Sequence, residues 1–308
     1  MSMKLKIWLA LLTVYIVWGA TYLGIRFAVE SIPPFLMAGT RFLVSGVILY
    51  VWRRLAGDPA PTRGQWARAG LVGLLLLLGG NGLVSLAEQN VASGIAALIV
   101  GSSPLWMTTF EALRPGGVRP GVLGIVGLVI GFGGIALLVA PSLLSGIAGS
   151  APPLGVITLL FAALFWSIGS VYSRHADLPA SSLLTNGMEM LVGSLGLFLA
   201  GTFTGEWQHL APAAISLRSW LGLAYLIAFG SMAGFTAYAW LLRSAPVSLV
   251  STYAYVNPLV AILLGSLLAQ ETLTVHVLIS AAIIIGSVVL INASRRAKPV
   301  ISPAAPAD

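Results

Sequence analysis

Long apolar runs alternate along the chain with short breaks that are polar or rich in proline and glycine. Each run is close to the roughly 20 apolar residues that a helix needs to cross the hydrocarbon core of a bilayer. None alternates polar and apolar residues as a β-barrel strand would. The runs are predicted to be membrane-spanning helices, because a lone strand cannot satisfy its backbone in lipid. The ten expected spans are residues 7–28, 34–52, 69–87, 92–112, 121–140, 152–173, 181–203, 218–241, 246–268 and 274–293.

Two parts of the chain look like copies of each other. Trp18 and its neighbours recur 148 positions later around Trp166, and Pro104 recurs 154 positions later as Pro258. If each copy crosses the membrane five times, the second copy inserts upside down, which is an architecture of transporters. We therefore expect an all-α membrane protein with ten transmembrane helices in two inverted five-helix repeats. The expected units are residues 1–141 and 152–293, followed by a disordered cytoplasmic tail at 294–308.

The composition supports a membrane protein independently of the pattern. Apolar residues make up 58% of the chain and charged residues only 8%, whereas a soluble domain carries about 25% charge. The absence of cysteine excludes disulfides, thiol catalysis and thiolate metal sites. The formal charge of +7 does not indicate nucleic-acid binding, because the basic residues lie at the ends of apolar runs.

The distribution of basic residues predicts the orientation in the membrane. With the N-terminus in the cytoplasm, thirteen basic residues fall on the cytoplasmic side and only Arg26 and Arg218 on the other. An even number of spans also returns the C-terminus to the cytoplasm. The expected location is the inner membrane of a bacterium. The thirteen residues are Lys4, Lys6, Arg53, Arg54, Arg63, Arg68, Arg114, Arg119, Arg174, Arg243, Arg295, Arg296 and Lys298.

Several short motifs spread over nearly the whole chain carry a family resemblance. They are Trp18-Gly19 with Thr21-Tyr22, Ala38-Gly39-Thr40-Arg41-Phe42, Ala87-Glu88-Gln89-Asn90 running into Gly94-Ile95-Ala96-Ala97, Pro104, and Tyr253-Ala254-Tyr255-Val256-Asn257-Pro258. With these motifs the chain resembles the EamA-type carriers of the drug/metabolite transporter superfamily. The resemblance implies a ten-helix inverted-repeat bundle in which the first four helices of each unit line a central cavity. It does not indicate the substrate.

Arg41 and Glu189 are charged residues within predicted spans, at equivalent places in the two repeats. An arginine inside the membrane costs about 2.5–3.5 kcal/mol on insertion scales, so it normally faces protein or water. Arg41 either caps or pairs locally, or it attracts a carboxylate or gates the cavity. Glu189 either has a structural role, binds or gates with Arg41, or carries a proton.

Two further carboxylates, Glu88 and Glu111, lie near the ends of predicted spans, where a charge can reach headgroups or water. Glu111 stands three residues before Arg114, the spacing of a helical ion pair. We expect structural roles for both.

Aromatic residues mark the expected cavity. Tyr15, Trp18 and Tyr22 share one face of the first helix, and Trp166 with Ser170 repeats part of that face in the sixth. An aromatic wall suits amphipathic substrates or organic cations, which can lie on ring faces. The other aromatic candidates for the cavity are Tyr238, Tyr253 and Tyr255.

Pro104 and Pro258 are expected to break the same helix in both halves. A proline removes one backbone hydrogen bond and frees a carbonyl. The break is either a static kink or a hinge at which polar groups contact the substrate. The polar groups assigned to the cavity here are Ser102, Ser103 and Asn257.

Glycine spacing in the fifth span indicates close helix packing. Gly127 and Gly131 form a G-x-x-x-G pair, which lets two helix backbones approach within the chain or across a dimer. Three tryptophans near span ends, Trp8, Trp52 and Trp220, fit interfacial anchors. The histidines lie scattered near loops, so we expect no metal site and no cofactor.

These features favour a secondary carrier that exports amino acids or similar small amphipathic metabolites by alternating access. The alternatives are efflux of lipophilic cationic drugs, or uptake by a carrier of the same fold. Aromatic walls and Glu189 favour cations, whereas Arg41 opposes them. An enzyme is not expected, because the spans contain no metal pair, Ser/His dyad or paired aspartates. The expected partners are a small-molecule substrate and the lipid bilayer, with no nucleic acid, and the chain acts as a monomer or a homodimer.

Overall fold

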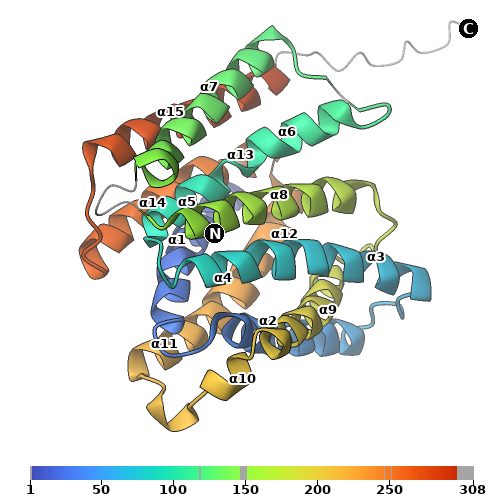
Figure 1. Cartoon of the computed structure of the whole chain (residues 1–308). Helices are drawn as coiled ribbons and strands as arrows, with labels where there is room; N and C mark the ends of the chain where they lie inside the picture. Colours follow the sequence, from blue (N-terminus) through green and yellow to red (C-terminus); the bar gives the residue numbers. More distant parts are fainter. Residues whose placement is uncertain (1, 118, 146–150, 246, 251, 297–308) are drawn as a thin grey trace, which may run out of the picture.

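The fold is built from helices throughout the part of the chain that the structure describes. This computed structural model describes residues 2–117, 119–145, 151–245, 247–250 and 252–296, and every regular element in these ranges is helical (Figure 1). The expected tail at 294–308 and the connection between the two expected units, residues 142–151, fall partly outside these ranges.

The first half contains five helical rods, of which the third and fourth change their geometry along their length. In the third, a π-helical segment joins two α-helices, and in the fourth the helix is interrupted at Ser102. The elements are α1 (Met3–Ala28), α2 (Pro34–Leu55), α3 (Arg63–Gly73), η1 (Leu74–Gly82), α4 (Leu83–Ala87), α5 (Ser93–Gly101), α6 (Ser103–Leu113), α7 (Val122–Ala140) and η2 (Pro141–Ser145).

The second half follows the same plan, with short extra elements in one connection. A π-helical segment again lies within the third rod of this half. The elements are α8 (Pro153–His175), α9 (Ser182–Phe203), α10 (Glu206–His209), η3 (Pro212–Ala214), α11 (Leu217–Tyr225), η4 (Leu226–Ala233), α12 (Gly234–Ser244), α13 (Val247–Val250), α14 (Tyr253–Leu268) and α15 (Val275–Arg296).

The expected spans agree with the helices, although the fourth is interrupted at Ser102 and the ninth is divided. Within the described residues, nine helical stretches are long and apolar enough to cross a membrane, and α14 is a shorter apolar helix. The ninth expected span, 246–268, is divided into α13 and α14. Pro258 lies inside α14, which continues through it, whereas Pro104 lies in the first turn of α6, next to an interruption.

Helix starts follow local sequence signals. Thr62 and Gln65 form a reciprocal capping box at the start of α3, in which each side chain bonds the other residue's backbone N–H. Pro33 and Pro34 begin α2, and Pro152 and Pro153 begin α8, because a proline in the first turn has no N–H to leave unsatisfied.

Corresponding helices of the two halves pack together. The helix pair α2 and α9 packs along its length, as does the pair α7 and α15. Helix α1 packs on α11, α12 and α14, while α8 packs on η1, α4, α5 and α6. Figure 1 shows α7 and α15 side by side along the upper edge of the bundle. The remaining helices enclose the centre of the molecule.

Glycines allow α7 to approach its neighbours closely. A Cβ atom added at Gly127 would lie 2.8 Å from Ile291 of α15. One added at Gly131 would lie 2.6 Å from both Leu105 and the hydroxyl of Ser287. The close packing expected from the G-x-x-x-G spacing is confirmed, and it is a contact within the chain.

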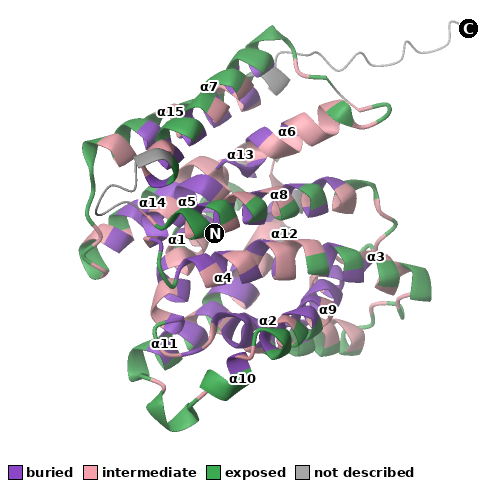
Figure 2. Ribbon diagram, viewed as in Figure 1, coloured by how far each residue is buried: buried purple, intermediate pink, exposed green. Residues whose placement is uncertain are grey.

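The outer faces of the helices are apolar. Figure 2 shows exposed residues along the outer edges of α7 and α15, and the exposed residues of α2 include Val44, Val47 and Ile48. Apolar exposure of this extent is unusual for a soluble monomer and is what lipid would cover. The expected anchors Trp8, Trp52 and Trp220 are 53%, 48% and 49% exposed, as residues at a membrane interface would be.

Unusual backbone conformations recur at the same offsets as the sequence motifs. Gly57 and Gly205, 148 positions apart, follow α2 and α9 with φ of +94° and +74°. Gly116 and Gln270, 154 positions apart, have φ of +72° and +53°. The repeat is therefore present in the local backbone as well as in the sequence.

Hydrogen bonds gather several connections at one end of the bundle, which we call the Glu88 end. An Arg26 guanidinium nitrogen donates to the backbone carbonyls of Glu88 and Gln89 beyond α4. Glu271, beyond α14, accepts from the backbone N–H and hydroxyl of Ser93 at 2.7 and 2.8 Å. These bonds join α1 to the loop after α4, and the loop after α14 to the start of α5.

A third carboxylate at the Glu88 end caps another helix. Glu206 accepts from the backbone N–H groups of Phe35 and Leu36 at 3.2 and 3.0 Å, which satisfies donors in the first turn of α2. Burial raises the pKa of Glu206, and the two backbone donors act in the opposite direction.

The other end of the bundle, which we call the Arg53 end, carries ion pairs. Arg53 pairs with Asp58 at 2.7 Å, and Arg68 of α3 pairs with Asp177 beyond α8 at 2.7 Å. The pairs are partly or largely exposed, so each contributes little to stability. A further ion pair here, between Glu111 and Arg114 at 2.8 Å, confirms the pairing expected from their spacing.

Candidate substrate-binding cavity

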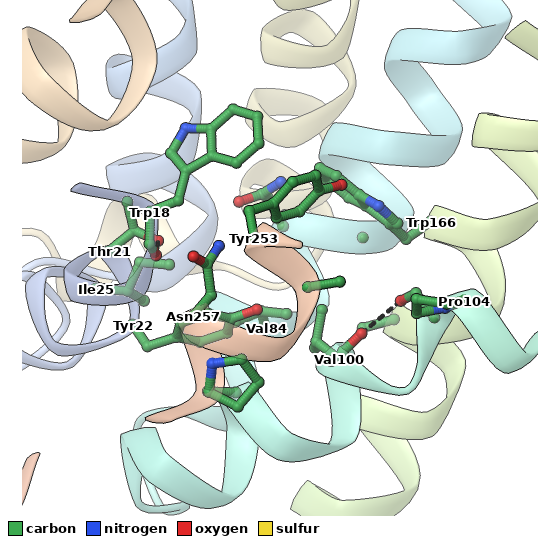
Figure 3. Close-up of a pocket in the computed structure, with 18 of the residues that line it drawn as sticks. Trp18, Thr21, Tyr22, Ile25, Val84, Val100, Pro104, Trp166, Tyr253 and Asn257 are labelled. Carbon is green, nitrogen blue, oxygen red and sulfur yellow. Dashed lines mark hydrogen bonds between the residues drawn. The ribbon is translucent and has the colours of Figure 1, made fainter. Parts of the chain in front are cut away.

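A cavity lies near the centre of the bundle, between helices of both halves (Figure 3). Of the fifteen residues expected at the substrate site or hinge, nine line it. They are Trp18, Tyr22, Arg41, Ser103, Pro104, Trp166, Tyr253, Asn257 and Pro258. Further lining residues that the sequence reading did not select are Thr21, Ile25, Phe42, Gly80, Asn81, Val84, Ala97, Val100, Gly101, Met107, Ala162, Phe235 and Ala254.

Aromatic rings form one wall of the cavity. Trp18 lies with its ring centroid 5.3 Å from that of Tyr253 and 5.3 Å from that of Phe235, both edge to face. Tyr238 lies 5.0 Å from Trp18 and 5.7 Å from Tyr253, so it supports the wall from behind although it does not line the cavity. We call Trp18, Phe235, Tyr238 and Tyr253 the aromatic cluster.

The indole of Trp18 is fixed in place. Its Nε1 donates to the carbonyl of Gly230 in η4 at 3.2 Å, and the indole packs on Gly234, where an added Cβ would lie 2.4 Å from Nε1. A π-helical segment distorts the ordinary ladder of backbone bonds, so a carbonyl there is a natural acceptor for a side chain. The wall is therefore held by a hydrogen bond as well as by packing.

Arg41 supplies a positive charge to the cavity. The residue is 4% exposed, and its Nε donates to the hydroxyl of Ser231 at 2.9 Å. Its guanidinium also lies 4.7 Å from the ring centroid of Phe42. Within the described residues, no carboxylate forms an ion pair with it. The terminal nitrogens therefore have no ion-pair partner in the part of the chain that the structure describes.

The interruption between α5 and α6 borders the cavity. The hydroxyls of Ser102 and Ser103 donate back to the carbonyls of Ile99 and Val100, each at 2.5 Å, so both hydroxyls are satisfied by the last turn of α5. Ser102 is fully buried and does not line the cavity. Its position beside Pro104 made it a candidate for the cavity, but its side chain points into the protein interior.

The two prolines come close to the same break. A Cβ added at Gly101, the last residue of α5, would lie 2.7 Å from the ring of Pro258. Pro104 lies in the first turn of α6, where it needs no backbone partner. Both line the cavity, although only Pro104 accompanies an interrupted helix.

Asn257 presents an amide at the cavity wall. With its nitrogen oriented to suit its surroundings, the amide donates to the carbonyls of Tyr253 at 3.2 Å and Tyr15 at 3.3 Å. It thereby ties α14 to α1. The hydroxyls of Tyr15 and Thr252 are also hydrogen-bonded to each other, which makes Tyr15 a link between these helices.

Three other candidates also lie away from the cavity lining. The hydroxyl of Tyr255 accepts from Asn292 of α15. Ser170 lies one turn beyond Trp166 without lining the cavity. Glu189, in α9, is 7% exposed. Its backbone carbonyl packs on Gly73 of α3, where a Cβ added to the glycine would lie 2.2 Å from the carbonyl oxygen. The structure does not bring Glu189 and Arg41 together in the cavity lining.

The expected exposure of Glu88 is wrong. Its neighbours Gln89 and Asn90 are exposed, but Glu88 itself is 0% exposed. The turn after α4 directs its side chain into the protein, one helical turn beyond Val84 of the cavity lining. A position near the end of a span did not show in which direction the side chain points.

Asn81 is a cavity residue with a recognisable sequence signal. It is the only strongly polar side chain in the run Leu74–Gly82. A polar residue inside an apolar span normally faces protein or water, so it could have been selected on that ground.

Known proteins resemble the chain along nearly its whole length. It is 40% identical over 298 residues to the "Uncharacterized inner membrane transporter YedA" of Escherichia coli (strain K12). The alignment covers 96% of this chain and 94% of that protein. It is 27% identical over 296 residues to the "Uncharacterized transporter YvbV" of Bacillus subtilis (strain 168), with the same coverage. A solved structure described as "Crystal structure of protein" has a similar fold, with a TM-score of 0.64 at 21% identity over 94% of this chain and 98% of that one.

One family model matches each half separately. The EamA-like transporter family matches residues 5–140, which cover nearly all of α1 to α7, and again residues 153–293, which cover nearly all of α8 to α15. The two matches explain why motifs and backbone features recur along the chain. They also confirm the family resemblance in the sequence. The chain belongs to the EamA-like transporter family, and it is a membrane transporter.

Proposed function

We propose that this transporter is a secondary carrier that exports amino acids or similar small amphipathic metabolites by alternating access through the central cavity. The observation that carries this proposal is Arg41, a buried guanidinium in the cavity lining without an ion pair among the described residues. A buried cation without a partner is costly, and a substrate carboxylate would relieve that cost.

The geometry around Arg41 favours a carboxylate. Because Ser231 takes the Nε donor, the terminal nitrogens remain for an anion, and a guanidinium presents its donors in a planar fork that fits a carboxylate. The rings of Trp18, Tyr253 and Trp166 would accommodate the apolar part of the same molecule. A small amphipathic acid combines both features.

Alternating access is supported by the repeat. Residues 1–141 and 152–293 form the two proposed units, and their inversion across the membrane would place equivalent gates on opposite faces. The pairing of α2 with α9 and of α7 with α15 suits a two-fold relation between the units. The break beside Pro104 is the proposed hinge, and Pro258 packs against it.

The proposed orientation places the Arg53 end in the cytoplasm together with both termini. Basic side chains cluster at that end, which contains Lys4, Lys6, Arg63 and Arg68 besides Arg53. The Glu88 end, with Glu206 and Glu271, would then face outward. We propose the bacterial inner membrane as the location and either a monomer or a homodimer as the working form.

Efflux of lipophilic cations is the second candidate function. The aromatic cluster favours it, since a cation over a ring face is attracted by about 0.5–2 kcal/mol. Arg41 in the same cavity opposes it by repulsion. Uptake through the same cavity remains the alternative direction, because gradients outside the protein decide the direction of a carrier.

A ligand panel separates the two substrate classes. The midpoint of thermal unfolding of the purified protein is measured with amino acids and with lipophilic organic cations. A true ligand at 100 times its Kd stabilises the folded state by about 2.7 kcal/mol. We expect amino acids to raise the midpoint and Arg41→Ala to abolish the rise, whereas Arg68→Ala at the exposed ion pair retains it. Stabilisation by cations alone would overturn the proposed substrate class.

A further inference from the structure

Glu88 is a buried carboxyl group without a bonding partner. The residue is 0% exposed, and neither side-chain oxygen has a hydrogen-bond partner among the described residues. Arg26 approaches the same residue but donates to its backbone carbonyl. Buried polar groups are normally satisfied, so an exception calls for an explanation in terms of function or state.

Several charged and titratable groups surround this carboxyl group. Glu271 acts on it from the loop after α14, Arg26 and Tyr22 from α1, and Arg41 from α2. Two of them, Tyr22 and Arg41, line the cavity. Glu88 is therefore influenced both by groups that line the cavity and by groups in the loops at the Glu88 end.

The surroundings favour the neutral form of the group in this conformation. Burial, with the negative charge of Glu271 as the second cause, raises the pKa of Glu88 well above its ordinary value, although Arg26 and Arg41 act in the opposite direction. Moving an unpaired carboxylate out of water is strongly unfavourable, and taking up a proton avoids that cost.

We propose that Glu88 is the proton-binding site that couples this carrier to a proton gradient. With a proton on one of its oxygens the side chain fits the dry site and the Glu88 end closes. When the proton leaves to water, the carboxylate needs hydration and the Glu88 end opens. The inference rests on the proposed carrier function and names its coupling ion.

A proton fits this site better than a metal cation. A hard cation such as Ca²⁺ needs six to eight oxygen ligands, and Mg²⁺ needs six. Within the described residues, no group of three His, Asp or Glu side chains could hold a metal ion. Glu271, the carboxylate that acts on Glu88, is already engaged by Ser93 and Gly94. A proton needs only the one carboxyl group.

The sign of the pH effect follows from the linkage between closure and protonation. Closure raises the pKa of Glu88 above the value that it has when hydrated. Closure is therefore most favourable below the hydrated value and is lost as pH rises through the raised value. Between these two values one proton is linked to opening, so the opening equilibrium changes about tenfold per pH unit.

The test uses a cysteine reporter, which is clean because the chain contains no cysteine. Val91, three residues beyond Glu88, is 1% exposed and packs on Gly155 of α8, where an added Cβ would lie 2.5 Å from it. Val91→Cys in the full-length protein is labelled with a membrane-impermeant maleimide over a pH series. The labelling rate of Val91→Cys is divided by the labelling rate of Gln208→Cys, an exposed position at the same end. This division removes the pH dependence of thiol reactivity itself.

With Glu88 intact, we expect this rate ratio to rise by about tenfold per pH unit within the linkage window and then to level off. Glu88→Gln should hold the ratio low at every pH. Glu30→Gln, at an exposed ion pair with Arg218, should follow the parent curve. A flat parent curve, or an unchanged rise in Glu88→Gln, would overturn the proposal.

A second replacement guards against misfolding of Glu88→Gln, whose amide would bring new unsatisfied donors into the site. Glu88→Leu fits a dry site of this size and should fold, with a labelling ratio that does not respond to pH. If neither variant folds, the parent curve alone decides. No measurement in this series needs a substrate, so failure of the amino-acid assignment and failure of the proton site are separate results.

Discussion

Arg41→Ala is expected to weaken binding of a carboxylate-bearing substrate by about 2–5 kcal/mol, the usual cost of removing one partner of a desolvated charge pair. At 1.4 kcal/mol for each factor of ten, even the lower limit is about 30-fold. The reason is that Arg41 is the positive charge in the cavity lining and has no ion pair among the described residues. The measurement is substrate binding by the purified variant.

Two comparisons make the Arg41 prediction specific. Arg41→Lys keeps the charge but loses the planar fork, so it should recover part of the affinity. The carboxamide of the same metabolite has no carboxylate for the guanidinium to bind, so Arg41→Ala should not weaken its binding. If Arg41→Ala weakens acid and amide alike, the guanidinium supports the protein and does not recognise a carboxylate.

Trp18→Ala is expected to lower the free energy of unfolding by about 3–5 kcal/mol, the typical cost of truncating a large aromatic side chain in a packed interior. The variant loses three ring contacts of the aromatic cluster and the hydrogen bond to the carbonyl of Gly230. It should therefore impair both folding and substrate binding. Chemical unfolding in detergent and the ligand panel measure the two effects.

Trp8→Ala is the matched control for Trp18→Ala, because it removes the same side chain from the same helix at a position that is 53% exposed. Its effect on stability should be within about 0.5 kcal/mol, as for most exposed positions. Trp18→Phe keeps a ring but not the N–H donor, and should fall between the two. Equal destabilisation by Trp18→Ala and Trp8→Ala would mean that the aromatic cluster does not hold the wall.

The sequence predicted the helices well, because a span in lipid must be long, apolar and helical. It also predicted the packing at Gly127 and Gly131, because a glycine has no side chain and therefore lets neighbouring residues approach its backbone closely. It did not show that α14 continues through Pro258. Whether a proline interrupts a helix depends on how neighbouring helices support the freed backbone, and the break in this half lies before Tyr253.

Residues of the cavity were harder to predict than the helices. Trp18 and Trp166 were selected by their repeat, and both line the cavity. Tyr255 and Ser102 lie in the same stretches of sequence but turn away, because the rotation of each helix is set by packing and not by apolar content. An apolar span has little hydrophobic asymmetry to show which face looks inward.

Glu88 shows the same limitation for a charged residue. Its place near the end of a span suggested contact with water, and Gln89 and Asn90 are indeed exposed. The direction of its side chain depends on a turn that the sequence does not determine on its own. The presence of Arg26 over this turn, 62 positions away in the chain, could not be read from local sequence.

Entrance counterflow in proteoliposomes tests the carrier function most directly. Vesicles that contain the purified protein are loaded with an unlabelled amino acid from the ligand panel and diluted into a trace of the labelled form. A carrier that exposes one cavity to each side in turn should accumulate label transiently above its equilibrium level, and Arg41→Ala should abolish the overshoot. Entry of label without an overshoot, or an unchanged overshoot in Arg41→Ala, would contradict alternating access through this cavity.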